Sequence, residues 1–249
     1  MERHLRKPFQ GVLNIVRFNW HFYILAFFLI TCLFAITILC SGQLNWICYL
    51  IIIGIILGTT LSLIASYYIY DVSNLYSLKW LDDVEIKQEN HLLNINAGFD
   101  ETSYLLKRKY VSSNLTVMDF YNPAKHTEVS IERARKAYPP YPGTLAIETS
   151  NIGVPTKSID CAFVILAAHE IRDKQEQIIF FKQIKKSLKD DGKVIVVEHN
   201  RDIYNFLVYN LGCFHFFNPR RWKDVFKKSG LQLTQTKKIT PFINVYYLT

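Results

Sequence analysis

The chain of 249 residues has few cysteines and glycines, and its longest apolar stretches contain no charged residue. Its five cysteines are Cys32, Cys40, Cys48, Cys161 and Cys213. None of them forms a CxxC pair, so the sequence contains no readable disulfide framework or cysteine-based zinc site, and we predict no metal site. This cysteine usage is typical of a reducing compartment.

Charge is missing from residues 22–40 and again from residues 46–70. At about 1.5 Å per residue, each stretch is long enough to span the hydrocarbon core of a bilayer. The first stretch is too long for a signal peptide, and no small-residue cleavage site follows it. Two such stretches also argue against a buried hairpin in a soluble protein. We predict a two-helix transmembrane hairpin over residues 22–70.

Acidic residues are also scarce in the N-terminal segment, residues 1–21. Against Glu2, this segment carries the basic residues Arg3, Arg6, Lys7 and Arg17. The short turn between the two spans has no basic residue, so the positive-inside rule places both termini and the C-terminal domain in the cytoplasm, at an inner or cytoplasmic membrane. For the connector, residues 71–90, we predict a short amphipathic helix at the membrane surface. The alternative is a helix that packs on the next domain.

Strand-like and helix-like segments alternate over residues 91–249. The strand-like segments are 92–96, 115–118, 144–147, 161–166, 193–198, 231–234 and 245–248. The helix-like segments are 102–109, 128–137, 175–188 and 222–228. Such alternation predicts an α/β domain with a doubly wound parallel sheet of about seven strands, and a ligand at the carboxyl ends of those strands.

One glycine and one aspartate lie where a nucleotide would bind such a sheet. Gly98 follows the first strand of the domain, and a glycine turn before a helix lets the backbone approach a ligand. Asp119 ends the second strand, about 20 residues further on, where a carboxylate can accept hydrogen bonds from ribose hydroxyls. A simple turn at Gly98 and a cap at Asp119 are the structural alternatives.

These segments resemble class I S-adenosylmethionine-dependent methyltransferases over most of the chain from residue 92 onward. Residues 92–101 resemble the cofactor-binding motif of that family, and 119–123 followed by 131–136 resemble its ribose carboxylate and the next helix. Residues 148–160 and 188–192 resemble the adenine-contacting segment and the turn before the fifth strand. The quinone, small-molecule and lipid branch is the most similar. The resemblance implies a Rossmann-like, seven-stranded methyltransferase domain preceded by the transmembrane hairpin.

The resemblance also implies a cofactor, S-adenosyl-L-methionine, and a set of residues that hold it. The cofactor-binding residues that it implies are Asn94, Asn96, Ala97, Gly98, Asp100, Asp119, Phe120, Glu148 and Thr149. The chain differs from the family pattern at three of them. Asn94 stands where an acidic residue is usual, and Asn96 and Asp100 stand where glycines are usual, so Asn94 and Asp100 are expected to contact the methionine end of the cofactor.

His169 and Glu170 follow the fourth strand at the expected ligand end of the sheet and are the candidate catalytic residues. A histidine there can take a proton near neutral pH, and the alternative is a packing role. His199 and Arg201 are second choices, and His215 is interpreted as a packing or membrane-facing residue. The aromatic stretch 204–217 is expected to line a lipophilic pocket.

Three functions agree with these patterns. The preferred one is a membrane-anchored methyltransferase with a small lipophilic acceptor. The net charge of +8 suggests a nucleic-acid methyltransferase, but residues 167–170 do not form the Asn/Asp-Pro-Pro-aromatic tetrad of that class, so no nucleic acid is expected. The third is a catalytically inactive scaffold with the methyltransferase fold. The sequence does not indicate the oligomeric state.

Overall fold

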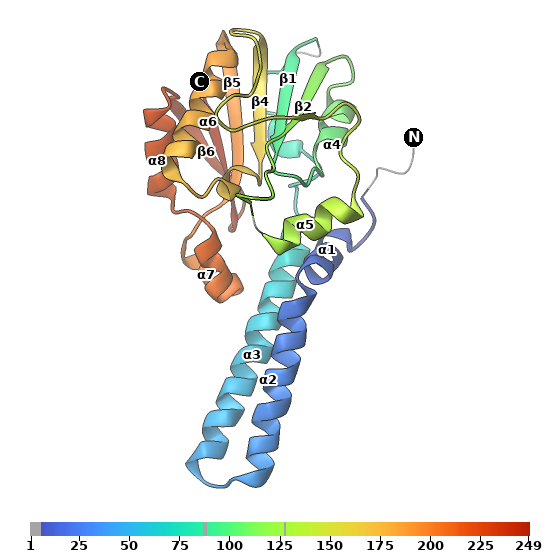
Figure 1. Cartoon of the computed structure of the whole chain (residues 1–249), viewed down its shortest axis with the longest axis vertical. Helices are drawn as coiled ribbons and strands as arrows, with labels where there is room; N and C mark the ends of the chain where they lie inside the picture. Colours follow the sequence, from blue (N-terminus) through green and yellow to red (C-terminus); the bar gives the residue numbers. More distant parts are fainter. Residues whose placement is uncertain (1–5, 87–88, 127) are drawn as a thin grey trace.

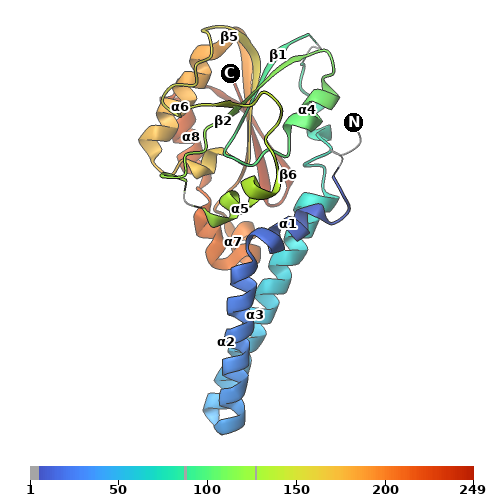
Figure 2. The same ribbon diagram turned by 45° about the vertical axis from the view of Figure 1, so that its right-hand side comes forward.

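The computed structural model describes residues 6–86, 89–126 and 128–249. Parts of the predicted N-terminal segment and connector, including Arg3, lie outside the described residues. The chain forms a helical hairpin and an α/β domain, and the hairpin projects from one end of that domain (Figure 1). The helices α1, α5 and α7 lie between the two parts (Figure 2).

The hairpin consists of α2 (Trp20–Leu39) and α3 (Gln43–Tyr67). These bounds agree with the predicted stretches to within three residues. A π-helical turn, η1 (Tyr68–Val72), continues α3, and the apolar helix runs over Gln43–Val72 in total. Both helices are long and apolar enough to cross a membrane, and nearly all of their side chains are uncovered by the rest of the chain. Two apolar helices alone are weak evidence for a membrane.

The domain is built on one sheet of seven strands in the order β3-β2-β1-β4-β5-β7-β6. The first five are β1 (His91–Asn96), β2 (Asn114–Asp119), β3 (Leu145–Ala146), β4 (Ile159–Ile165) and β5 (Leu188–His199), and they pair in parallel. The last two are β6 (Leu233–Thr240) and β7 (Ile243–Leu248), and β7 is antiparallel to both of its neighbours. The predicted doubly wound sheet is therefore confirmed, with an antiparallel hairpin at one edge.

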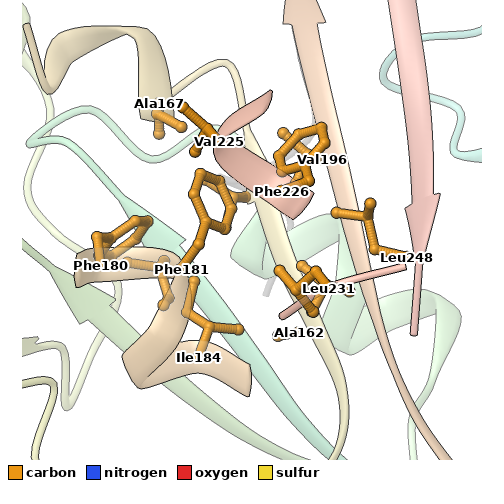
Figure 3. Packing of buried hydrophobic residues seen from close by; sticks show 14 of the residues in the cluster. Ala162, Ala167, Phe180, Phe181, Ile184, Val196, Val225, Phe226, Leu231 and Leu248 are labelled. Carbon is orange, nitrogen blue, oxygen red and sulfur yellow. The ribbon is translucent and has the colours of Figure 1, made fainter. Parts of the chain in front are cut away.

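Helices cover both faces of this sheet. The helices of the domain are α4 (Ser103–Lys109), α5 (Val129–Ala137), α6 (Lys174–Ser187), α7 (Ile203–Tyr209) and α8 (Pro219–Lys228), with the 3-10 turns η3 (Ala168–Glu170) and η4 (Asn210–His215), and α5 and α7 lie at the hairpin end of the sheet (Figure 1). The larger core lies between the sheet and α6 and α8, where Phe181 and Phe226 pack edge to face (Figure 3). Alternate residues of β4 face opposite cores, because successive side chains of a strand point to opposite faces.

The connector differs from its prediction. In the described part of residues 71–90, the chain forms bends, turns and one short 3-10 helix, η2 (Lys79–Leu81), in place of an amphipathic helix. Leu75, Leu78 and Leu81 are almost completely buried in the second core, beside β4 and β5. These leucines cover the face of the sheet that α6 and α8 leave open, so the connector packs on the domain, as the alternative interpretation proposed.

The N-terminal segment also folds onto the domain. Residues Gln10–Phe18 form α1, which the sequence analysis did not predict. The backbone N–H groups of Gly11 and Val12 donate to the Asp71 carboxylate at 2.7 and 2.8 Å. The hydroxyl of Tyr138, just beyond α5, donates to Asn14 at 2.9 Å. These contacts hold α1 across the carboxyl ends of the strands.

Candidate functional site

Three buried polar atoms at and just beyond the carboxyl end of β1 have no hydrogen-bond partner among the described residues. Asn94 donates from Nδ2 to Thr102 and Ser103, at 3.0 and 2.8 Å, and its Oδ1 accepts no bond within the described chain. Asn96 accepts the Gly98 N–H at 3.0 Å, while its Nδ2 is unpaired among the described residues.

Asp100 provides the third of these atoms. Its Oδ1 caps the start of α4 by accepting from the backbone N–H groups of Thr102 and Ser103, both at 2.9 Å. Its Oδ2 is buried with no partner in the described part of the chain. Buried polar atoms are nearly always hydrogen-bonded, so the two acceptors and one donor at this end indicate a place for a ligand.

The carboxyl end of β2 is different, because its carboxylate already has partners. Asp119 forms an ion pair with Arg135 of α5 and accepts the Tyr121 N–H at 2.8 Å. The Arg135 guanidinium also stacks over the Tyr121 ring, 4.6 Å from its centre. Gly98, with φ +92°, lies directly under this arginine, since a Cβ on Gly98 would be 2.9 Å from Arg135 Cδ. Arg135 therefore occupies the space between the glycine turn and the β2 carboxylate.

A cavity of about 220 Å³ opens at the ends of β1, β4 and β5. Asn96 and Ala97 line one side, His169, Glu170 and His199 line the other, and apolar side chains that include Phe18 and Phe216 complete the wall. Ligand pockets are usually larger, about 300–1,000 Å³. The cavity is small because α1 lies across it and contributes Gly11, Asn14, Ile15 and Phe18 to its lining.

Two carboxylates hold His169 at the far side of this cavity. The ring Nδ1 lies 2.6 Å from Glu198 Oε2, and Nε2 lies 3.2 Å from Glu170 Oε1. Burial opposes a charge on the ring, but Glu198 and Glu170 together raise the pKa of His169 to about 10. For Glu170, burial also opposes the charge, but bonds from His169 and His215 lower its pKa. His169 therefore already holds a proton at neutral pH, which must be displaced before the ring can act as a base.

His199 has the opposite electrostatic setting. Burial lowers its pKa to about 3, so the ring is neutral. Its Nδ1 lies 3.1 Å from Asn205 Oδ1, which accepts, so Nε2 accepts the Tyr70 hydroxyl at 2.9 Å. The ring also stacks on Phe216, with a centroid distance of 4.6 Å. His199 thus forms part of the cavity wall through a tautomer fixed by its neighbours.

No protein-family model matches the sequence, and no curated protein matches it. Solved structures do resemble it in fold. A SAM-dependent methyltransferase from Aquifex aeolicus has a TM-score of 0.53 and 14% identity, covering 77% of this chain and 97% of that one. A chain of the complex between the Haloferax volcanii Trm112 methyltransferase activator and a putative methyltransferase has a TM-score of 0.51 and 10% identity, covering 72% and 90%. The chain has the class I methyltransferase fold.

Within this methyltransferase fold, the predicted site residues fall into three groups. Asn96 and Ala97 line the cavity together with His169 and Glu170. Asn94, Gly98, Asp100 and Asp119 lie around the ends of β1 and β2, although Asp119 is paired with Arg135.

The third group lies away from the cavity. Phe120 is buried in the core against Phe180, with ring centroids 5.3 Å apart. Glu148 is exposed, and Thr149 is buried with its hydroxyl donating to Glu176 at 2.5 Å. Of the second choices, Arg201 is exposed, whereas His199 lines the cavity.

Sequence reasoning missed several residues of the methyltransferase-fold cavity. Among the lining residues, Tyr70, Tyr76, Glu101 and the cavity-facing side of α1 were not predicted as site residues, and neither was Glu198, which lies behind His169. Glu198 directly follows the apolar residues 194–197, and this position could have indicated a buried carboxylate that needs a partner. For α1, residues 11, 14, 15 and 18 have the spacing of one helix face.

His215 was assigned to packing, but it faces the same cluster. Its Nε2 lies 3.4 Å from Glu170 Oε1, and its Nδ1 lies 3.2 Å from Glu128 Oε1. The reason is the path of η4, which returns the chain from α7 toward η3. Arg172 fixes this return by donating from Nη1 to the carbonyls of both His169 and His215, at 3.0 and 2.6 Å.

Proposed function

We propose that the chain is a membrane-anchored S-adenosylmethionine-dependent methyltransferase that methylates a small lipophilic acceptor. The observation that carries the proposal is the set of buried polar atoms at the end of β1 that have no partner in the described part of the chain, in a protein with the methyltransferase fold. Fold alone does not define an activity, so the argument rests on this site.

The β1 end fits the amino-acid part of the cofactor. An ammonium group needs acceptors, and Asn94 Oδ1 and Asp100 Oδ2 are two buried acceptors without a partner among the described residues. A carboxylate needs donors, and Asn96 Nδ2 is a buried donor in the same position. A cofactor bound here would supply a methyl group already activated on a sulfonium, so the protein has mainly to orient the two reactants.

The opposite wall of the cavity fits an acceptor. His169 and Glu170 present polar groups to the cavity, while Phe18, Ile165 and Phe216 present apolar surface. A small molecule with an apolar body and one ionisable group fits such a wall. His169, which holds its own proton, and Glu170 can hydrogen-bond to that group and orient it for in-line attack, and this positioning is the chemistry that these residues support.

The hairpin supports the membrane part of the proposal. Apolar side chains on all sides of α2 and α3 are exposed in the isolated chain, which would be unfavourable in water. Helix α1, which lines the cavity, leads directly into α2 of the hairpin (Figure 2). A lipophilic acceptor would therefore reach the cavity from the bilayer, and anchoring would raise its effective concentration.

A second apolar surface lies beside the hairpin. Exposed apolar side chains project from α7 and η4, which neighbour α3 (Figure 1). These are Ile203, Tyr204, Phe206, Leu207, Leu211 and Phe214. We interpret this stretch, predicted to line a lipophilic pocket, as surface that enters the membrane interface next to the cavity.

Calorimetry of the full chain in detergent with S-adenosylmethionine and S-adenosylhomocysteine tests the cofactor assignment. We expect one site per chain for both ligands. Asn96→Leu, which removes the unpaired donor but keeps the side-chain size, should weaken both. The absence of heat and of thermal stabilisation with either ligand would show that the chain is not a methyltransferase.

A catalytically inactive scaffold is the second candidate, and Arg135 favours it. This side chain occupies the space between Gly98 and Asp119, and in doing so it satisfies the carboxylate that would hold a ribose. A scaffold would keep Arg135 in place and bind neither ligand. The same calorimetry with Arg135→Gln separates a scaffold from a closed site. Binding that appears only in the variant would indicate a site that Arg135 closes in the native chain, whereas a scaffold would bind neither ligand in either form.

The α7 surface is tested by charge substitutions. Leu207→Asp places a charge on a side chain that is 60% exposed beside the hairpin, and Val111→Asp is the matched control, 68% exposed at the amino-terminal end of β2. In liposomes containing cell lipid extract and radiolabelled cofactor, Leu207→Asp should slow label transfer into lipid, with unchanged cofactor affinity. Equal slowing by both variants, or label in water-soluble compounds, would contradict the lipophilic acceptor.

A further inference from the structure

His169, Glu170 and His215 come together from two separate turns of the chain. His169 and Glu170 belong to η3 after β4, and His215 ends η4 after α7. One ligand atom from each of the three residues lies within 4.8 Å of the others. We propose that this cluster binds one divalent first-row transition ion, with Zn²⁺ as the probe.

The distances agree with a shared ion. Glu170 Oε1 lies 3.2 Å from His169 Nε2 and 3.4 Å from His215 Nε2. Ligands at about 2.0–2.1 Å from a tetrahedral zinc are separated from one another by roughly 3.3–3.4 Å. Two of the three separations therefore match those of a shared ion, and all three ligand atoms lie within 4.8 Å of one another. Two imidazoles and one carboxylate are ligands of zinc or iron, and they do not suit Mg²⁺ or Ca²⁺, which prefer oxygen.

The second nitrogen of each histidine is already held by a carboxylate. Glu198, which is completely buried, binds His169 Nδ1 at 2.6 Å and accepts the His169 backbone N–H at 3.2 Å. Glu128 lies 3.2 Å from His215 Nδ1. Carboxylates in this position orient metal-binding histidines and leave Nε2 for the ion. Both histidines of the cluster thus have the outer contacts that a metal site needs.

The charges of the cluster also favour a cation. Glu170, Glu198 and Glu128 bring three carboxylates to the two imidazoles of His169 and His215. Because Arg172 donates to backbone carbonyls of His169 and His215, it braces the two turns and leaves the carboxylates to the histidines. With both imidazoles in the neutral form that binds metals, a dication would offset two of the three negative charges.

The cluster faces the cavity, which gives the ion a role. His169 and Glu170 line the cavity wall, and three protein ligands leave a position open in a tetrahedral site. An acceptor hydroxyl bound at that position would lose its proton more readily. This role in acceptor activation rests on the proposed function, whereas the metal site itself stands on the geometry of the side chains.

The test uses the full chain in detergent micelles, carrying a streptavidin-binding tag because a polyhistidine tag would bind the probe. After treatment with chelator, titration with Zn²⁺ should show one tight site per chain, and Co²⁺ should give visible absorption bands of a four-coordinate ion. His215→Ala and Glu170→Gln should each weaken Zn²⁺ binding by at least about 100-fold. Glu198→Gln should weaken it by about 10–100-fold, the range for an outer carboxylate.

His91→Ala is the matched control, because His91 is an exposed histidine at the opposite end of β1. It should bind Zn²⁺ like the wild type. The proposal fails if the wild type binds no stoichiometric Zn²⁺, or if Glu170→Gln and His215→Ala bind as tightly as His91→Ala. Calorimetry with S-adenosylmethionine on the same samples keeps the two proposals apart: cofactor binding without metal binding overturns the metal site alone, and the reverse overturns the methyltransferase proposal alone.

Discussion

The ends of β1 and β2 are adjacent in the sheet, yet they present their polar groups in different ways. At β1, Asn94, Asn96 and Asp100 each keep one buried polar atom without a partner in the described chain. At β2, Asp119 is bonded to Arg135 and to the Tyr121 N–H. Within the described chain, the β1 end thus keeps polar atoms free to bond a ligand, whereas the carboxylate at the β2 end is already paired with a side chain of α5.

This difference indicates where a cofactor would gain and lose free energy. Bonds formed at the β1 end satisfy atoms that are otherwise buried and unpaired, so each removes a penalty of about 1–3 kcal/mol. A bond formed to Asp119 first requires that Arg135 leave. That ion pair is partly exposed, with the Arg135 side chain 38% accessible, so its loss costs only about 0.2–1 kcal/mol. We therefore expect the β1 end to dominate binding.

The largest loss of cofactor affinity is expected from a substitution of Gly98, which lies between the ends of β1 and β2. A Cβ on Gly98 would lie 2.9–3.0 Å from Arg135 and Tyr121, and the backbone there has φ +92°. Gly98→Val should therefore weaken S-adenosylmethionine binding by about 100-fold or more, equivalent to about 3 kcal/mol. Gly143→Val is the control, since Gly143 has φ +79° and nothing within 4 Å of its added Cβ. Equal losses in both variants would point to backbone strain in place of a blocked ligand.

The next effect tests the β1 end alone. Asp100→Asn keeps an oxygen to cap α4 but replaces the unpaired carboxylate oxygen with an amide group. It should weaken cofactor binding by about 1.5–3 kcal/mol, the range for a hydrogen bond to a charged group, measured by calorimetry. The thermal midpoint of the ligand-free protein should stay within a few degrees. Unchanged affinity would mean that the unpaired oxygen does not face the cofactor.

The fold could be predicted from periodicity because both halves of the chain have strong patterns. The charge-free stretches gave the hairpin to within three residues, and α6 was placed to within one residue at each end by its apolar face. The prediction of a helix in the connector was wrong. The spacing of Leu75, Leu78 and Leu81 suits an amphipathic helix, but in the structure a series of turns places these side chains on the sheet. Local pattern indicates which side chains are buried and leaves the backbone path open.

The site was harder to predict because its partners are distant in sequence. Asn96, His169 and Glu170 follow strands, so topology was enough to bring them together. The pairing of Asp119 with Arg135 depends on how α5 packs, and α1 is held at the cavity by contacts with residues distant in sequence, among them Asp71 and Tyr138. The cluster around His215 depends on the return of η4 to η3. The spacing of residues along the sequence does not predict these tertiary contacts.

A smaller effect is expected at β2. Asp119→Asn removes the charge that would bind the ribose hydroxyls, at about 1.5–3 kcal/mol, but it also releases Arg135 and so spares the ligand the cost of breaking that pair. The net weakening, measured by the same calorimetry, should therefore be smaller than for Asp100→Asn. A larger loss in Asp119→Asn would reverse the order of the two ends and show that the ribose end dominates.

The smallest effect is expected from Arg135 and has the opposite sign. Arg135→Gln removes the ion pair with Asp119 and leaves a shorter, uncharged polar side chain at this position. If the arginine merely has to move aside, the cofactor should bind about 1.5–5-fold more tightly, which corresponds to the 0.2–1 kcal/mol of a partly exposed pair. Lys136→Gln is the control, because Lys136 pairs with Glu132 on the exposed side of the same helix. Weaker binding in Arg135→Gln would show instead that the guanidinium contacts the cofactor, and both ends of the site would then be arranged for it.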